Sequence, residues 1–235
     1  MANAKIIGIH DGKHIEADQS ARPLPMPIIQ LRDELKEQIK NLLRKLFDNA
    51  DDALFAMADK AGTNGDQSIY LESMREFRLQ KKFIANSFLQ QVTLSFTHLE
   101  STVNTQDDNE RVSDFENLSI LKNDELEISV ALEGMISRLR NSASSQLDDL
   151  QVRLESVIES HSIKPKYIPA GPEVLCDSFA FASSELEIDL KAKLVIFKLF
   201  ENSEPVDLLT VSSQLKKDEK LDMVGLLAVE MFLTK

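Results

Sequence analysis

The sequence is short of the residues that form disulfides, tight turns and metal sites. Its 235 residues include one cysteine, no tryptophan, two tyrosines, four histidines, seven glycines and seven prolines. The single Cys176 excludes an intramolecular disulfide framework and any CxxC zinc or redox motif. No GxGxxG or GxxxxGK pattern occurs, which excludes the usual phosphate-binding loops. So few turn formers over so long a chain favour few, long elements, and therefore helices.

The chain also lacks an excess of positive charge and any long apolar run. Its formal net charge is −12 at pH 7, so its average surface repels nucleic-acid phosphates and anionic lipid headgroups. The sequence contains no run of about 18 uncharged apolar residues, the length needed to span a membrane. Residues 1–20 also lack the apolar stretch of a signal peptide. These absences argue against nucleic-acid binding and membrane insertion, and they predict a cytoplasmic protein.

What the sequence does contain is three long stretches with apolar residues at spacings of three and four, the pattern of amphipathic helices. They cover residues 28–61, 67–99 and 124–160. Lys81 is the one break in the apolar stripe of the second stretch. Gly134 interrupts the third at a cost of about 1 kcal/mol relative to alanine. Shorter apolar helices are expected at 173–183, 188–201, 206–215 and 220–233.

Proline-rich and acidic segments separate these helices. We predict a flexible N-terminal arm at 1–27, a long-helix bundle at 28–161 and a C-terminal cluster of shorter helices at 162–235. Residues 100–117 form a polar, acidic linker within the bundle, and three prolines and a glycine break the chain within 162–172. The predicted fold is all-α, with three long antiparallel helices and the short-helix cluster packed on them.

Four aspartates crowd the stretch LFDNADDALFAMADKA at 46–61, where they could form a metal or acid/base site. At 100° per residue, Asp48, Asp52 and Asp59 share the face opposite the apolar stripe, and Asp51 lies on the flank of that acidic face. A carboxylate metal site in a helical bundle needs inward acids from several helices. We therefore interpret these acids as a solvated face. Phe55 falls among them, either as a stray exposed residue or as the mark of a second contact surface.

The second helix carries the densest basic run, MREFRLQKK at 74–82. A nucleotide-binding patch of Arg75, Arg78 and Lys82 is one hypothesis, although exposed aromatic partners are missing. Pairing with the acids of the first helix, if the two helices fold back as a hairpin, is the favoured interpretation because the connection between them is short.

The remaining reactive residues predict no catalytic, cofactor or metal site. His10 and His14 have ligand spacing but flank an Asp-Gly turn without a third ligand, and His98 and His161 are lone residues near helix ends. Cys176 stands at the start of an expected helix, where its pKa could be lowered. We interpret Cys176 instead as a small residue of the core, since no histidine is near it in the sequence.

Three stretches carry a family resemblance: LRKLFDNADDALFAMADKAGTNGDQSIYLESMREFRLQKKFI, LSILKNDELEISVALEGM and GPEVLCDSFAFASSELEIDLKAKLVIFKLFE. They resemble the N-terminal part of the proteobacterial domain of unknown function 1631, over about residues 23–201. The resemblance implies a helical cytoplasmic protein, generally longer than this chain, so that the chain is expected to be a short paralogue or an N-terminal fragment. Some members are labelled thymidine phosphorylase, and some relatives suggest cyclic dinucleotide signalling through a PilZ-like barrel.

From these observations we predict a non-enzymatic interaction or regulatory module that binds a protein partner or a second copy of itself through a helix face. The contact candidates are the apolar stripe of the third helix and Phe55 with Asp48, Asp52 and Asp59. Two rival functions stay open. One is an enzyme, either the labelled phosphorylase or an activity that uses Cys176. The other is a cyclic dinucleotide effector that binds through the basic run. The sequence identifies no small-molecule ligand.

Overall fold

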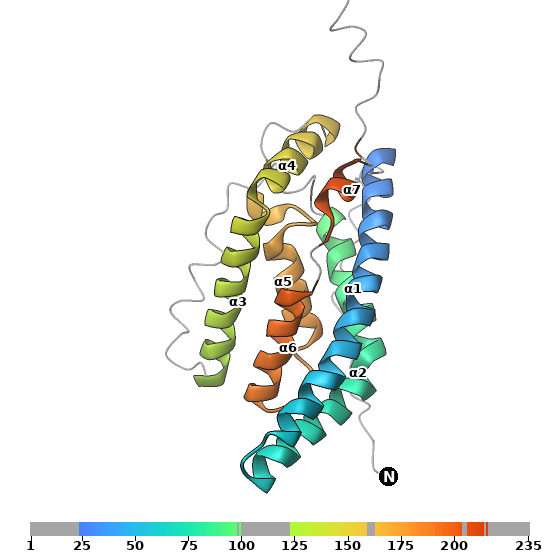
Figure 1. Cartoon of the computed structure of the whole chain (residues 1–235). Helices are drawn as coiled ribbons and strands as arrows, with labels where there is room; N and C mark the ends of the chain where they lie inside the picture. Colours follow the sequence, from blue (N-terminus) through green and yellow to red (C-terminus); the bar gives the residue numbers. More distant parts are fainter. Residues whose placement is uncertain are drawn as a thin grey trace, which may run out of the picture.

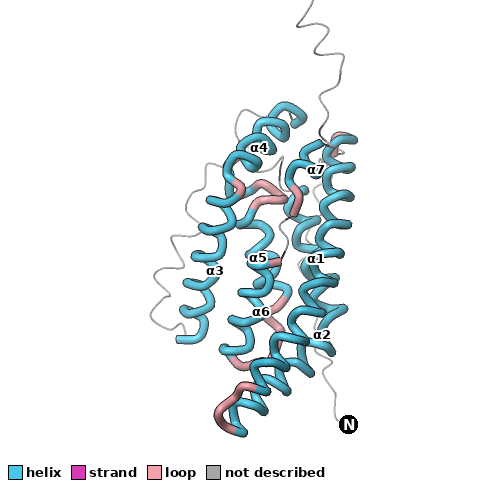
Figure 2. The backbone as a smooth tube through the Cα atoms, viewed as in Figure 1, coloured by secondary structure: helices cyan, strands magenta, loops and turns pink. Residues whose placement is uncertain are grey.

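The computed structural model describes residues 24–97, 99, 123–158, 163–203, 206–213 and 215 (Figure 1). Within these ranges every regular element is helical, as Figure 2 shows, so the predicted all-α class is confirmed. The elements are α1 (Met26–Asp59), α2 (Asn64–Thr97), α3 (Asn123–Ser142), α4 (Ser144–Ile158), the short 3₁₀ helix η3 (Pro165–Tyr167), α5 (Pro172–Ala182), α6 (Leu190–Asn202) and α7 (Leu208–Ser213).

The helices α1 and α2 form a long antiparallel hairpin. Pro27 lies in the first turn of α1, where a missing N–H costs nothing because that turn has no acceptor for it. At the tip of the hairpin the Thr63 hydroxyl accepts a hydrogen bond from the Asp66 N–H at 3.1 Å, which caps the start of α2. The buried residues of α1 recur every three to four positions: Ile28, Leu31, Leu35, Ile39, Leu43, Leu46, Phe47, Ala50, Leu54 and Ala58.

The third predicted helix is divided into α3 and α4 at Ala143, so the expectation of one continuous helix over 124–160 was wrong. The backbone is bent there rather than looped out, because Ala143 N still donates to Leu139 O at 3.1 Å. The Ser142 hydroxyl donates to the same carbonyl at 2.9 Å, a side-chain bond that competes with the helical ladder and bends helices. Gly134, the expected weak point, lies inside α3.

The helices α5 and α6 lie between the α1–α2 hairpin and α3 (Figure 1). The predicted arrangement, in which three long helices form one bundle with the short helices on its outside, is therefore not confirmed. The α4 end of the α3–α4 arm packs on α7. The helices α5 and α6 form the middle layer because they are strongly apolar, and they bury residues such as Cys176, Phe179, Ala192 and Ile196.

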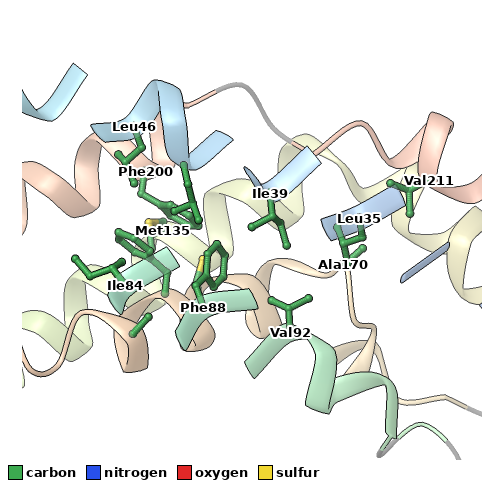
Figure 3. Close-up of a cluster of buried hydrophobic side chains, with 14 of the residues drawn as sticks. Leu35, Ile39, Leu46, Ile84, Phe88, Val92, Met135, Ala170, Phe200 and Val211 are labelled. Carbon is green, nitrogen blue, oxygen red and sulfur yellow. The ribbon is translucent and has the colours of Figure 1, made fainter. Parts of the chain in front are cut away.

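One hydrophobic core joins these layers. Figure 3 shows part of it, with Leu35 and Ile39 from α1, Phe88 from α2, Met135 from α3 and Phe200 from α6 among the labelled side chains. Both parts of the predicted division, 28–161 and 162–235, contribute to this core. The division itself stays a prediction.

Several predicted features lie outside the described residues. They are nearly all of the N-terminal arm, the Asp11-Gly12 turn, the four histidines, the acidic linker and the helix expected at 220–233. Among the residues that the structure does describe, no helix has both the length and the apolar character needed to cross a membrane.

Candidate functional site

The acidic face of α1 points to solvent. Asp48, Asp52 and Asp59 are all exposed, and the Phe55 side chain between them is 61% exposed. Met57 is exposed as well, whereas Ala58 beside it is buried. An uncovered aromatic ring thus stands among three exposed carboxylates.

Asp51 has a different environment from the other three aspartates. Its Oδ1 lies 3.0 Å from Arg78 Nε and its Oδ2 lies 3.4 Å from Lys81 Nζ, so it pairs with two cations of α2. The Lys81 ammonium also lies 5.6 Å from the centroid of the Phe47 ring, within cation–π range. These contacts explain why a lysine interrupts the apolar stripe of α2, and they agree with the favoured pairing of the two helices.

The three cations of the candidate basic patch have different environments. Arg75, Arg78 and Lys82 follow one another at helical spacing and so share one stripe of α2. Arg78 is taken up by Asp51, and Arg75 lines a surface depression together with Glu72 and Glu76. Lys82 is exposed. An anionic ligand would therefore meet carboxylates beside two of the three cations.

Cys176 lies in the core, fully buried at the start of α5. Burial, with a smaller contribution from the nearby carboxylates of Asp177, Glu173 and Glu201, raises the pKa of its thiol to about 12. The lowered pKa that a helix N-terminus could have produced is thus overridden by desolvation and negative charge. The thiol stays protonated at neutral pH, which agrees with its interpretation as a core residue.

The described residues bring no three potential metal ligands together. They do form an apolar cavity of about 250 Å³ that sequence reasoning missed. It lies where α1, the α3–α4 bend, α5, α6 and α7 meet, and its walls include Leu42, Ala143, Leu175, Phe200 and Leu208. These walls come from five separate segments, so no local sequence signal could have identified the cavity.

Glu201 forms one wall of this cavity, and its carboxylate pairs with two cations that come from different helices. Arg138 of α3 donates two hydrogen bonds to its carboxylate, and Lys198 of α6 donates a third at 2.7 Å. The Arg138 hydrogen bond is the main reason that the pKa of Glu201 is lowered, with Lys198 adding to it and burial opposing it. The carboxylate therefore links α3 to α6 and already accepts three hydrogen bonds.

The apolar stripe of the third helix, the other predicted contact, faces inward. Met135, Leu147, Leu150 and Leu154 are buried, and Leu132, Ile136, Leu139, Ala143 and Val157 pack partly buried against the same core. The stripe is covered by the protein's own helices. It is therefore not available as a partner surface in this fold.

Comparison with protein families supports the resemblance seen in the sequence. The family model described as "Protein of unknown function (DUF1631) N-terminal domain" matches residues 23–214. The match continues past residue 201, where the resemblance was expected to end. Comparisons with curated proteins and with solved structures find no match.

Proposed function

The chain belongs to the family described as protein of unknown function (DUF1631) N-terminal domain, and we propose that it is a non-enzymatic module that binds another protein through the outer face of α1. The observation that carries this proposal is the exposed Phe55 between Asp48, Asp52 and Asp59. The cytoplasmic location and a regulatory role stay predictions.

An uncovered phenylalanine is a ready anchor for a partner. Fully burying such a side chain contributes about 1.5–3 kcal/mol, and binding energy in protein interfaces concentrates in a few large anchors surrounded by polar residues. The three carboxylates around Phe55 favour a partner with lysine or arginine beside an apolar pocket, because complementary charge raises the association rate and selects the partner.

Two features of the structure weigh against the enzyme hypotheses, the first against an activity that uses Cys176 and the second against the labelled phosphorylase. The thiol is buried, and its pKa of about 12 leaves almost no thiolate at neutral pH, although the thiolate is the nucleophilic form. The cavity of about 250 Å³ is lined mainly by apolar side chains, whereas a phosphorylase needs a phosphate-binding region.

The cyclic dinucleotide hypothesis is weakened by the environment of the basic run. Arg78 already pairs with Asp51, and Arg75 shares its depression with Glu72 and Glu76. A phosphate that approached these arginines would compete with one carboxylate and be repelled by two others.

Site-specific photo-crosslinking in the cells to which the protein is native tests the proposal. A benzoylphenylalanine at position 55 is expected to give one defined protein adduct. The matched control is the same probe at Val152, which is 65% exposed on α4 and should not give that adduct. With the partner purified, Phe55→Ser should lower its affinity by at least about tenfold. Identical adducts at positions 55 and 152, or turnover of a nucleoside by the purified chain, would overturn the proposal.

A further inference from the structure

A second group of exposed apolar side chains lies on α2 and α5, away from Phe55. Leu79 and Phe83 are one turn apart on α2, and they are 68% and 48% exposed. Phe181, near the end of α5, is 57% exposed. Phe83 and Phe181 line the same surface depression, together with Gln80, Ser87, Ser184 and Glu185.

A neighbouring depression continues this surface toward the start of α2. Leu79 forms part of its lining, as do Ile69 of α2 and Ile188 of the α5–α6 connection. The two depressions follow the same helix and are both walled on the far side by residues between Phe181 and Asp189. We call this surface the α2 groove. Its apolar positions are Ile69, Leu79, Phe83, Phe181 and Ile188.

The rim of the α2 groove is strongly acidic. The two depressions contain five carboxylates and one cation, Arg75; the carboxylates are Glu72, Glu76, Glu185, Glu187 and Asp189. Asp189 accepts a hydrogen bond from Lys191 N at 2.8 Å and so caps α6. For the four glutamates, the ion pairs formed within the described part of the chain offer no cationic partner.

We propose that the α2 groove binds a basic amphipathic helix of a partner protein. Leu79 and Phe83 are separated by one turn, a rise of about 6 Å along α2, so a ligand helix lying in the groove can set successive apolar side chains against them and against Phe181. Helix-in-groove recognition uses anchors at spacings of three, four and seven residues. Lysines or arginines on either side of that apolar stripe would meet the unpaired glutamates.

Charge favours a basic helix over two other possible occupants of the groove, an anionic membrane surface and a second copy of the chain. An anionic membrane surface is repelled by the acidic rim. A second copy of the chain carries the same net charge of −12, so its average surface opposes the rim rather than complementing it. The groove is built by α2 and the α5–α6 region, and the inference therefore stands or falls independently of Phe55 on α1.

A model peptide tests the proposal with the full chain. The probe is a fluorescein-labelled 14-residue peptide of leucine and lysine in amphipathic helical order, and its affinity is measured by fluorescence anisotropy. The double variant Phe83→Ser/Phe181→Ser and the variant Glu185→Lys/Glu187→Lys should each lower the affinity by at least about tenfold. The binding should weaken as salt is raised.

Matched controls separate this site from a general attraction of cations to an acidic protein. Val130→Ser/Val152→Ser removes two comparably exposed apolar residues from α3 and α4. This variant should leave the peptide affinity unchanged. Because all substituted residues are exposed, thermal unfolding should confirm that each variant remains folded.

Each of the following outcomes would overturn the proposal. They are no binding of the leucine–lysine peptide, equal affinity for a leucine–glutamate peptide of the same pattern, an equal loss in the α3–α4 control, and a wild-type dimer that Phe83→Ser/Phe181→Ser converts to monomer in sedimentation equilibrium. The last result would assign the groove to a second copy of the chain. Loss of peptide binding only on Phe55→Ser would move the site to α1.

Discussion

Two sets of phenylalanines in this molecule have opposite environments. Phe88, Phe179, Phe197 and Phe200 are buried where α2, α5 and α6 meet, whereas Phe55, Phe83 and Phe181 are exposed. The contrast is sharpest on α5, where Phe179 is fully buried and Phe181, two residues later, is 57% exposed. Two residues along a helix correspond to a rotation of about 200°, so the two rings lie on opposite faces of one short helix.

The buried set is held by ring contacts that join the middle layer to the hairpin. The Phe179 ring stacks on Phe200 with centroids 4.2 Å apart, and it forms T-shaped pairs with Phe88 and Phe197, each with centroids 5.9 Å apart. Such pairs add about 0.5–1.5 kcal/mol each beyond the burial of their area. The exposed set has no comparable ring partners within the described residues. This difference indicates that one set stabilises the fold and the other is left for contacts outside it.

The largest effect is expected for Phe179→Ala. Removing a fully buried ring that touches three others should lower the free energy of unfolding by about 3–5 kcal/mol, through lost burial and the cavity left behind. Urea unfolding followed by circular dichroism measures the change. A loss below about 1 kcal/mol would mean that the aromatic layer does not join α5 to α2 and α6 as described.

Cys176 lies one turn before Phe179 and shares its buried environment. Because its thiol pKa rises from an ordinary value near 9 to about 12, the folded chain should hold about a thousandfold less thiolate at pH 8 than an exposed cysteine would. Reaction with a chromogenic disulfide reagent should be slow in buffer and fast in strong denaturant. Rapid reaction of the native chain, with a rate that titrates near pH 8–9, would contradict this environment.

Glu201 gives a smaller and pH-dependent effect. Arg138 and Lys198 lower its pKa in the folded chain, so its stabilisation is fully present above the ordinary glutamate pKa near 4.5 and is lost as the pH falls through the lower, folded-state value. Glu201→Gln should therefore cost about 1 kcal/mol at pH 7, as expected for a hydrogen bond to a charged group that is partly exposed. The difference from wild type should shrink as the pH is lowered toward 3.

Glu185→Gln is the matched control for that measurement, because Glu185 is exposed in the α5–α6 connection. Its unfolding free energy should differ little from that of the wild type across the same pH range. A Glu201→Gln deficit that stays constant from pH 7 to about pH 3 would show that the effect comes from lost packing rather than from the ion pairs.

The same contrast explains what the sequence could and could not predict. The exposure of Phe55 follows from the helical wheel alone, since it depends only on the rotation per residue along an uninterrupted helix. The helices α1 and α2 were likewise predicted to within about three residues at each end, because their apolar spacing is a local signal. Pairing of the basic run with the acids of α1 was predicted once the hairpin was assumed, but the particular pair of Asp51 and Lys81 was not.

The predictions that failed depend on contacts between distant segments. The bend at Ala143 rests on the Ser142 hydroxyl and on a change of packing partner from α5 and α6 to α7, neither of which alters the apolar spacing. The middle position of α5 and α6 and the α2 groove require residues about 100 positions apart to meet. A signal for the groove was present, since Leu79 and Phe83 fall outside the apolar stripe of their helix.

The smallest effect on stability is expected for the exposed phenylalanines. Phe55→Ser and Phe181→Ser should each change the free energy of unfolding by no more than about 0.5 kcal/mol, because surface side chains without packed neighbours contribute little to folding. The comparison with Phe179→Ala uses the same urea measurement, and Phe181 is the sharper case because it lies on the same helix. A cost near 3 kcal/mol for Phe181→Ser would show that its ring is covered by other parts of the chain in solution. The α2 groove would then be part of the core rather than a surface open to a partner.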